Sequence, residues 1–487
     1  MAGVTVLERS HVLPLPSAAP TRLPLTFLDL PWLFFHPSQQ LFFYDYPHPA
    51  SHFASAALPL LKSSLSLALR LFFPLAGHLH TAPARHPAIL CTPRLAGVSL
   101  TIAESDDDFH DLCHDDGSRG LQSQRAAHRF HPLVPALSPE EGHAVALMAI
   151  QITVFPGSGF SVGITYHHVA ADERTFNNFL KAWTARCTHA LIGNAECPAP
   201  TPLIDPPRFD RAIIRDMPTL EQRFLNEWWK QQQQLPYSPL IRGTVMCPVV
   251  PDDGQCDMVR STFVVVPSHM ELVRSWIMGH CEANGLPLPV HLSPYVLTCT
   301  FLWVVRVKTH FQLSGLGKNG RTMDIDSLAV RTSYFGYIAG GISRLGYPVP
   351  ESYFGNCVGF GRAEAACSDL VGEAGIFHAA TALGSAIKRL DRSMLESAEE
   401  WILDWRAMLE SDVHVVVVGS PKVDFYDRDF GWGRPRKIEE VSTDWTGAIS
   451  LHESRDVEGG IEVGVSLLKA KMDAFIALFV EGFRILK

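Results

Sequence analysis

Two histidines and an aspartate in the middle of the chain could carry acid–base chemistry. His167 and His168 are adjacent, and Asp172 follows four residues after His168. An imidazole titrates near neutrality, so it can remove the proton of an alcohol while that alcohol attacks a carbonyl group. A histidine taken at random is more often a hydrogen-bonded core residue than a base. His168 is therefore a candidate general base whose role depends on its surroundings.

The segments on either side of these residues predict a rigid support. An apolar run at 148–155 and an alternating pattern at 160–166 predict two strands, and the Pro-Gly-Ser-Gly sequence between them predicts a tight turn. Asp172 is placed to cap a helix. Beyond it, large apolar residues recur at helical spacing: Phe176, Phe179, Leu180, Trp183 and Cys187. The pattern thus predicts a base held at a strand end.

Three other matches to functional motifs do not fit their context. The side chains of His167 and His168 would point to opposite sides of a strand, so we expect no metal site there. Gly159-Phe160-Ser161-Val162-Gly163 matches the nucleophile elbow, but its serine lies inside an alternating strand and not on a strand-to-helix turn. The glycine-rich stretch 315–320 matches GxGxxG without the strand and helix that a dinucleotide site needs.

Composition argues against several classes of function. The 487 residues carry a net charge of −9 and no basic cluster, so we expect no nucleic-acid partner. We find neither a signal peptide nor an apolar segment long enough to span a bilayer, and expect no membrane association. The 10 cysteines form no CxxC pairs. This pattern favours reduced thiols and a cytoplasmic protein over a disulfide framework or a zinc site.

Chain length and pattern favour an α/β protein of two domains. Helices and strands are mixed without a regular βαβ rhythm. The stretch 194–218 holds six prolines and little periodicity, and we interpret it as a crossover loop between an N-terminal domain at 1–193 and a C-terminal domain at 219–487. In the C-terminal domain we expect helices at 220–234, 268–284 and 294–310, a strand pair near 244–266, a strand at 414–418, a hairpin at 448–454 and 461–468, and a last helix that buries Met472, Phe475, Ile476, Phe479, Val480 and Phe483.

A second motif, far from the first, points to a family. Asp429-Phe430-Gly431-Trp432-Gly433, taken with His168-Val169-Ala170-Ala171-Asp172, makes the chain resemble the plant BAHD acyl-CoA-dependent acyltransferases, whose signatures are HxxxD and DFGWG. The first motif alone is weak, because chloramphenicol acetyltransferases and peptide-synthetase condensation domains share it. Tyr353-Phe354-Gly355-Asn356-Cys357 matches YFGNC, typical of members that acylate anthocyanin and other flavonoid or phenolic glucosides, often with malonyl-CoA. The resemblance covers nearly the whole chain and includes Thr26-Phe27-Leu28-Asp29.

The resemblance implies a fold and a set of partners. The fold is two similarly sized chloramphenicol-acetyltransferase-like domains with an active-site channel between them. An acyl-CoA, malonyl-CoA in the leading interpretation, would enter from one face as co-substrate, and a phenolic glucoside acceptor from the other. No cofactor would stay bound, and we expect a monomer.

The resemblance also implies roles for individual residues. His168 would deprotonate a sugar hydroxyl in a ternary complex, without an acyl-enzyme. Asp172 would support the base structurally and point toward a basic partner, for which Arg306 and Arg344 are candidates. Three residues would line the coenzyme A side near the thioester: Gly419, Ser420 and Pro421. The remaining motif residues would be structural: Tyr353, Asn356, Asp429, Gly431, Trp432 and Gly433.

Arg174 is a candidate for binding the malonyl carboxylate. A site that prefers malonyl-CoA to acetyl-CoA needs a cation or strong donors aimed at the terminal carboxylate. Arg174 lies in the first turn of the predicted helix, where backbone N–H groups also favour an anion. The alternative is a helix-surface arginine that pairs with Glu173.

Two departures from the family pattern keep other functions open. Glu173 stands where the family usually has glycine, which would add backbone strain if φ is positive there, and also a negative charge. The stretch 340–345 reads Gly-Gly-Ile-Ser-Arg-Leu and lacks an acid and an arginine of the usual pattern. The alternatives are a hydroxycinnamoyl or other acyl-CoA transferase, a catalytically weakened paralogue that binds phenolic ligands and, from the GxSxG match, a thioester hydrolase.

Overall fold

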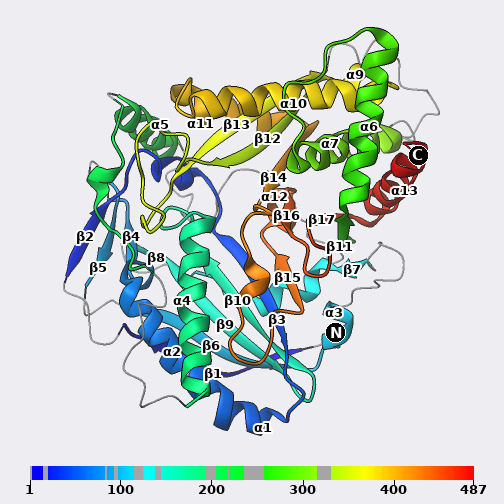
Figure 1. Cartoon of the computed structure of the whole chain (residues 1–487). Helices are drawn as coiled ribbons and strands as arrows, with labels where there is room; N and C mark the ends of the chain where they lie inside the picture. Colours follow the sequence, from blue (N-terminus) through cyan, green and yellow to red (C-terminus); the bar gives the residue numbers. More distant parts are fainter. Residues whose placement is uncertain are drawn as a thin grey trace.

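The computed structural model describes ten stretches of the chain: residues 3–14, 20–82, 85–92, 97–113, 124–137, 144–193, 205–217, 219–234, 257–314 and 331–486. Two large β-sheets, each flanked by helices, form its lower and upper parts in Figure 1. This mixed α/β architecture confirms the predicted fold class. No helix in the described stretches is both long and apolar enough to cross a membrane.

The lower sheet holds the strands that flank the candidate base. Its strand order is β1 (Val4–Val12), β6 (Val98–Ser105), β9 (Met148–Phe155), β10 (Gly159–Tyr166), β3 (Ser38–Asp45) and β15 (Lys437–Glu440). The β9–β10 hairpin has the bounds that its apolar and alternating patterns predict. Helices α2 (Leu58–Leu71) and α4 (Glu173–Leu191) run side by side along this sheet (Figure 1), where the Trp183 indole N–H donates to the Leu61 carbonyl at 3.1 Å.

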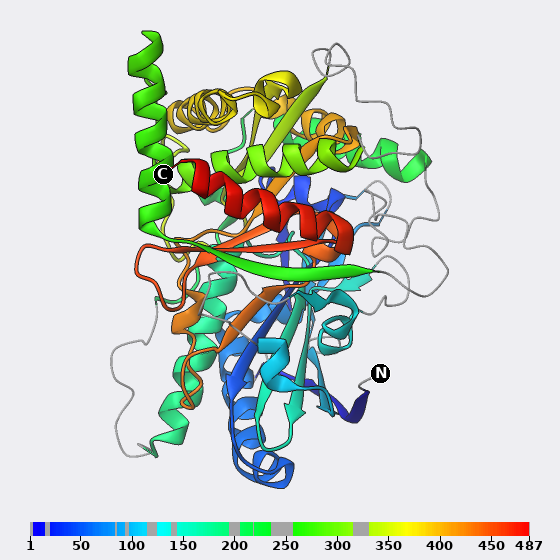
Figure 2. The same cartoon turned by 90° about the vertical axis from the view of Figure 1, so that its right-hand side faces the viewer.

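The upper sheet belongs mostly to the C-terminal half. Its strand order is β13 (Val358–Ala366), β12 (Thr332–Gly340), β14 (His414–Val418), β16 (Ile449–Glu453), β17 (Ile461–Leu468), β11 (Met258–Val265) and β7 (Arg125–Ala126). Helices α7 (Pro294–Ser314) and α13 (Lys469–Ile485) lie across one face of it, as Figure 2 shows. A smaller sheet, in the order β2 (Thr21–Pro24), β5 (Ala88–Cys91), β4 (His78–His80) and β8 (Ala144–Ala146), packs at the side of the lower part (Figure 1).

The remaining elements are short or cover these sheets. The helices are α1 (Ala50–His52), α3 (Phe109–Cys113), α5 (Leu220–Gln234), α6 (Pro267–Asn284), α9 (Cys367–Val371), α10 (Gly375–Arg392), α11 (Trp401–Glu410) and α12 (Thr443–Thr446). One π-helical turn, η2 (Phe53–Ala57), joins α1 to α2. The 3₁₀ turns are η1 (Leu30–Phe34), η3 (Phe73–Ala76), η4 (Ala127–Arg129), η5 (His131–Leu133), η6 (Arg211–Ile213), η7 (Ala398–Glu400) and η8 (Phe425–Asp427).

Most local predictions match these bounds, with some exceptions. The strand pair near 244–266 is described only for β11, because 235–256 lies outside the described residues, as does the glycine-rich stretch 315–320. Ser161 is fully buried inside β10, which rules out an exposed nucleophile elbow. Val480 in the last helix was predicted to be buried and is 46 % exposed. Val480 was included because it follows Ile476 at helical spacing. The buried face of α13 is narrower than this and holds only Met472, Phe475, Phe479 and Phe483.

The two halves exchange strands. β15, from the C-terminal half, pairs antiparallel with β3 and completes the lower sheet. β7, from the N-terminal half, pairs antiparallel with β11 at the edge of the upper sheet. The domain boundaries at 193 and 219 therefore stay a prediction. Each large sheet contains a strand from both sides of these boundaries.

A buried ionic cluster fastens this exchange. The carboxylate of Glu439 on β15 lies 2.7 Å from the guanidinium of Arg125 on β7 and 3.0 Å from that of Arg260 on β11. Arg260 also pairs with Asp444, whose other oxygen lies 2.9 Å from His131 Nε2. Burial raises the pKa of Glu439, but the two arginines outweigh this and lower it to about 2.

Glu439→Gln should therefore destabilise the protein strongly. Removing one partner of a buried pair leaves uncompensated charge and typically costs about 3–5 kcal/mol. Because the folded-state pKa lies below the unfolded value, the stabilisation by Glu439 is present above pH 4.5 and is lost as the pH falls toward 2. Urea unfolding from pH 7 to pH 3 should show that loss in the natural protein and a flatter profile in the variant. Glu8→Gln, which breaks a half-exposed pair with Lys62, is the matched control and should cost at most about 1 kcal/mol. Equal costs for both variants would contradict the role of the cluster.

Candidate active site

His168 lies just beyond the end of β10, in a tight turn that leads into α4. The His167 N–H donates to the Leu147 carbonyl at 2.8 Å, which continues the β9–β10 pairing, and the Ala171 N–H donates to the His168 carbonyl at 3.3 Å. His167 is buried, and its Nδ1 accepts a bond from the Val169 N–H at 3.4 Å. The two imidazoles thus have different partners, and the role of His168 as the base stays a prediction.

Asp172 is the N-cap of α4, as its position in the sequence predicts. One carboxylate oxygen accepts a bond from the Thr175 N–H at 2.8 Å, and the other accepts from the Cys357 N–H at 3.0 Å. Its basic partner is Arg174 at 3.4 Å. The prediction of Arg306 or Arg344 is wrong, since the guanidinium of Arg344 pairs with Asp391 at 2.8 Å.

Arg174 has a different role from the one that the sequence suggests. Its guanidinium donates to the backbone carbonyls of Glu351 at 2.6 Å and Tyr353 at 2.8 Å, and it contacts that of Gly355 at 3.4 Å. With Asp172 as a fourth partner, its terminal nitrogens hold the segment around 351–355 against the start of α4. We correct the assignment of Arg174 as the malonyl-binding residue, because such a contact would have to break these bonds.

Asn356 sets the orientation and tautomer of His168. The Asn356 Oδ1 atom lies 3.2 Å from the His168 Nδ1 atom, and the Asn356 amide nitrogen donates to the His168 carbonyl at 2.9 Å. The same nitrogen donates to Asp29 at 2.9 Å, which fixes the amide with its oxygen toward the imidazole. Nδ1 therefore carries the proton, and Nε2 keeps the lone pair that a general base needs.

The surroundings of His168 keep it uncharged. Burial is the main cause that lowers its pKa, to about 4, although Asp172, Asn356 and Asp29 act in the opposite direction. The indole of Trp32 stacks on the imidazole, with ring centroids 3.4 Å apart and an interplanar angle of 9°. The base is thus neutral at physiological pH and held on one face by an aromatic plane.

Sequence reasoning missed the contribution of Asp29, Trp32 and Asn356 to the base. Asp29 and Asn356 were noted only as parts of motifs, and Trp32 was given no role. The sequence around Asp29 could have indicated its role. Asp29 lies in an apolar run, and a carboxylate buried in such a run needs hydrogen-bonding partners.

The other motif residues act as supports. Asp429 accepts bonds from the N–H groups of Gly431 at 2.6 Å and Gly433 at 2.9 Å, and both glycines have positive φ, which favours glycine at these positions. The Trp432 ring packs on Tyr46, with centroids 5.7 Å apart. The Tyr353 hydroxyl accepts a bond from Arg211 at 3.0 Å. That the motif residues have structural roles only stays a prediction.

Glu173 is not strained. It is the first residue of α4, and in the described stretches only Thr219 and Ser397 combine a side chain with positive φ. One of its carboxylate oxygens is enclosed and lacks a hydrogen-bond partner. Burial and the nearby Glu440 raise the pKa of Glu173 to about 8, while a bond from the Ser420 backbone lowers it. Burial likewise raises the pKa of Glu440, to about 7.

Glu173 contacts the segment that the sequence predicts to line the coenzyme A side. That segment follows β14, and its members are Gly419, Ser420 and Pro421. Gly419 has a φ of +80°, and a Cβ there would collide with the Leu451 carbonyl. The contact between Ser420 and Glu173 ties the segment to the start of α4. Its role toward coenzyme A stays a prediction.

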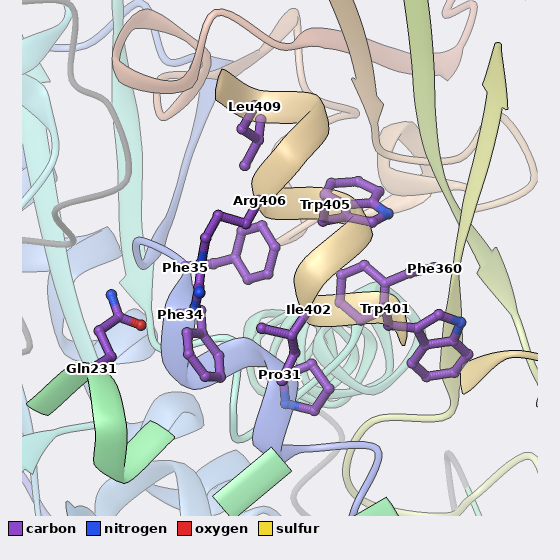
Figure 3. A pocket seen from close by; sticks show the side chains of 10 residues that line it. All are labelled: Pro31, Phe34, Phe35, Gln231, Phe360, Trp401, Ile402, Trp405, Arg406 and Leu409. Atoms are coloured by element: carbon purple, nitrogen blue, oxygen red, sulfur yellow. The ribbon is translucent and has the colours of Figure 1, made fainter. Parts of the chain in front are cut away.

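An apolar pocket opens one aromatic ring away from the base. Trp32 lies between His168 and Phe360, with the Trp32 and Phe360 ring centroids 5.0 Å apart. The pocket is lined from η1, α5, β13 and α11 by the side chains that Figure 3 shows: Pro31, Phe34, Phe35, Gln231, Phe360, Trp401, Ile402, Trp405, Arg406 and Leu409. Such a surface suits a planar aromatic group.

The arrangement is suited to proton transfer. A neutral, oriented imidazole lies beside an aromatic pocket, and the described residues contain no group of three His, Cys, Asp or Glu side chains placed to hold a metal ion. The chemistry that these residues can perform is the activation of a hydroxyl group for attack on an electrophile.

Comparisons with known proteins agree with this site. The model of the Transferase family matches residues 2–210 and 319–480. The chain is 32% identical to the malonyl-coenzyme A:anthocyanin 3-O-glucoside-6''-O-malonyltransferase of Dahlia pinnata, over 99% of this chain and 97% of that one. It is also 32% identical to coumaroyl-CoA:anthocyanidin 3-O-glucoside-6''-O-coumaroyltransferase 1 of Arabidopsis thaliana, over 98% and 97%.

The fold matches that of a solved structure. The crystal structure of vinorine synthase superposes with a TM-score of 0.66 at 18% identity, and the match covers 98% of each chain. The chain belongs to the Transferase family, and the resemblance to the BAHD acyltransferases that its motifs carry is confirmed.

Asn356→Ala should slow turnover because Asn356 acts by orienting His168. Without Asn356, neither the tautomer nor the angle of His168 is fixed, and misplacement of a catalytic group by about 1 Å can cost about a hundredfold in rate. We expect kcat to fall by about that factor with little change in KM. Residues that act as one unit are not additive, so the double variant His168→Ala/Asn356→Ala should be no slower than His168→Ala. Additive losses would contradict the coupling.

Glu173→Gln should change stability in a pH-dependent way. Because the folded-state pKa of Glu173 is raised to about 8, the folded protein holds this proton more tightly than the unfolded chain. Its contribution to stability therefore falls as the pH rises from 4.5 to 8. The variant should gain stability relative to the natural protein across this window in denaturant titrations. Glu410→Gln, on the exposed end of α11, should show no such gain. If the stability difference between Glu173→Gln and the natural protein does not change with pH, the pKa of Glu173 is not raised.

Proposed function

We propose that the protein is an acyl-CoA-dependent O-acyltransferase that transfers malonyl from malonyl-CoA to a sugar hydroxyl of a flavonoid, anthocyanin or other phenolic glucoside. The observation that carries the proposal is the His168 imidazole, whose Nδ1 proton is held by Asn356 and whose Nε2 is left to act as base. Full-length similarity to glucoside malonyltransferases supports the substrate classes.

The reaction would proceed in a ternary complex. His168 Nε2 takes the proton of the sugar hydroxyl while its oxygen attacks the thioester carbonyl carbon. The tetrahedral intermediate collapses with cleavage of the C–S bond, and the thiolate of coenzyme A takes the proton from the imidazolium. The products are the sugar ester and free coenzyme A. The transient positive charge on His168 is offset by the carboxylates of Asp172 and Asp29, which raise its pKa.

The apolar pocket supports an aromatic acceptor. Its walls come from Phe34 and Phe35 on one side and from Phe360, Trp401 and Trp405 on the other (Figure 3). A planar aglycone placed there would lie near the base, because the Trp32 ring packs on both Phe360 and His168.

The alternative is a hydroxycinnamoyl or other aromatic acyl donor on the same scaffold. One observation favours it: Arg174, the candidate for the malonyl carboxylate, is engaged by backbone carbonyls. An acyl group without a terminal carboxylate needs no such cation. The intact His168–Asn356–Asp29 chain argues against a catalytically weakened paralogue.

We further infer that the protein works in the cytoplasm as a monomer. The seven free cysteines in the described stretches are all buried, a state typical of a reducing compartment. The base, its orienting residues and the aromatic pocket all come from a single chain.

A panel assay tests the proposal. The purified protein is offered malonyl-, acetyl- and p-coumaroyl-CoA with and without an anthocyanidin glucoside, and coenzyme A release and ester formation are followed. Malonyl transfer to the glucoside is expected. His168→Ala should lower its rate by about 10²–10⁴-fold, whereas His167→Ala, whose side chain contacts the Val169 N–H, should do less. Coumaroyl transfer would favour the alternative donor, and release to water alone, or equal effects of both variants, would overturn the mechanism.

A further inference from the structure

A second cavity lies behind the aromatic wall of the apolar pocket, at the edge of the upper sheet. We call it the edge pocket. It has a volume of about 300 Å³ and is bounded by the edge strand β13, by Tyr337 on β12, and by α10 and α11. Phe360, Trp401 and Trp405 line both cavities, so the two pockets share one aromatic wall.

Two buried hydrogen-bonding groups at the edge pocket have no partner in the protein. The hydroxyl of Tyr337 makes no hydrogen bond, although its side chain is only 2 % exposed. The indole N–H of Trp405 is likewise buried and unpaired, and in Figure 3 its nitrogen points away from Phe35 and the apolar pocket. Buried groups of this kind normally find partners, so these two are free to bond with a ligand.

The fold is shaped to place the Tyr337 hydroxyl there. Tyr337 pairs with Gly361 across the two strands, and a Cβ on Gly361 would collide with the Tyr337 ring. Glycine therefore lets the ring lie flat over the edge strand. Ser397 at the rim has a φ of +61°, one of two such non-glycine residues in the described stretches. Backbone strain of this kind gathers at binding sites.

The charges around the edge pocket are mixed and nearly balanced. Arg362 pairs with Asp404 at 3.2 Å and lies 3.9 Å from Glu364. Arg389 on α10 makes no ion pair with any described residue. Glu396, which also lines the pocket, carries the opposite charge. With both donors and acceptors present and no dominant sign of charge, the pocket does not select an ion.

We propose that the edge pocket binds a glycosyl unit of the acceptor. Aromatic rings can cover the C–H face of a sugar, while the Tyr337 hydroxyl, the Trp405 N–H and Arg389 can bond its hydroxyl groups. An aglycone in the apolar pocket would place a further sugar next to the shared wall. The choice of ligand rests on the proposed function, which supplies glycosides as acceptors.

Direct titration tests the pocket without turnover. Methyl β-glucoside and cellobiose are titrated into the protein, and binding is followed by calorimetry and by the emission of tryptophan. Both are expected to bind. Tyr337→Phe and Arg389→Ala should each weaken binding by about three- to tenfold, as expected for one hydrogen bond. Tyr337→Phe should not lower the melting temperature, because the hydroxyl that it removes has no partner in the protein.

Two control variants make the test specific. Tyr334→Phe removes a hydroxyl from the same strand and keeps the ring over which Arg362 lies, at 5.2 Å. Arg392→Ala removes a similar exposed arginine from the last turn of α10. Neither residue lines the edge pocket, and neither variant should change saccharide binding. No binding to the natural protein, or equal weakening in the controls, would overturn the proposal.

Kinetics then connect the pocket to the acceptor. If acyl transfer is found, kcat/KM for a phenolic diglucoside should exceed that for the monoglucoside, and Tyr337→Phe should reduce this preference by the same three- to tenfold factor. Saccharide binding with an unchanged preference would refute the link to the acceptor. Absence of acyl transfer, with saccharide binding intact, would refute the proposed function and leave the edge pocket supported.

Discussion

The buried carboxylate of Asp29 is the point on which the active-site geometry depends. It accepts bonds from the Thr26 N–H and hydroxyl at 2.8 and 2.7 Å and from the Asn356 N–H and amide at 3.0 and 2.9 Å, and Arg211 lies 3.8 Å away. One fully enclosed charge thus joins three stretches of chain that are more than a hundred residues apart. Burying a carboxylate is costly unless its oxygens are bonded, so this charge demands one arrangement of its partners, and the tautomer of His168 follows from it.

The acids near the base form two groups with opposite functions. Asp29 and Asp172 are saturated with N–H and O–H donors, and each stabilises a particular backbone conformation. One oxygen of Glu173 has no donor, and burial favours the protonated forms of both Glu173 and Glu440. The protein therefore combines carboxylates that fix structure with carboxyl groups whose charge depends on pH.

Local patterns in the sequence predicted the parts of this structure that depend on local forces. The β9–β10 hairpin, the Asp172 cap and helix α5 follow from periodicity and capping, which act over a few residues. The role of Arg174 was misjudged because its partners are carbonyls about 180 residues later in the chain. The Asn356–His168 contact and the two exchanged strands were not predicted for the same reason. Motifs indicated which residues matter, but not which of them touch.

The strand exchange also constrains how the chain can fold during synthesis. The lower sheet, which carries the base, lacks its last strand until residues 437–440 have been made, near the end of the 487-residue chain. Until then the edge of β3 is open, with the unpaired backbone groups that promote aggregation. A ribosome adds about 5–20 residues per second, so this edge stays exposed for many seconds after β3 leaves the ribosome. An isolated N-terminal half would therefore keep an uncompleted sheet with an open edge at β3.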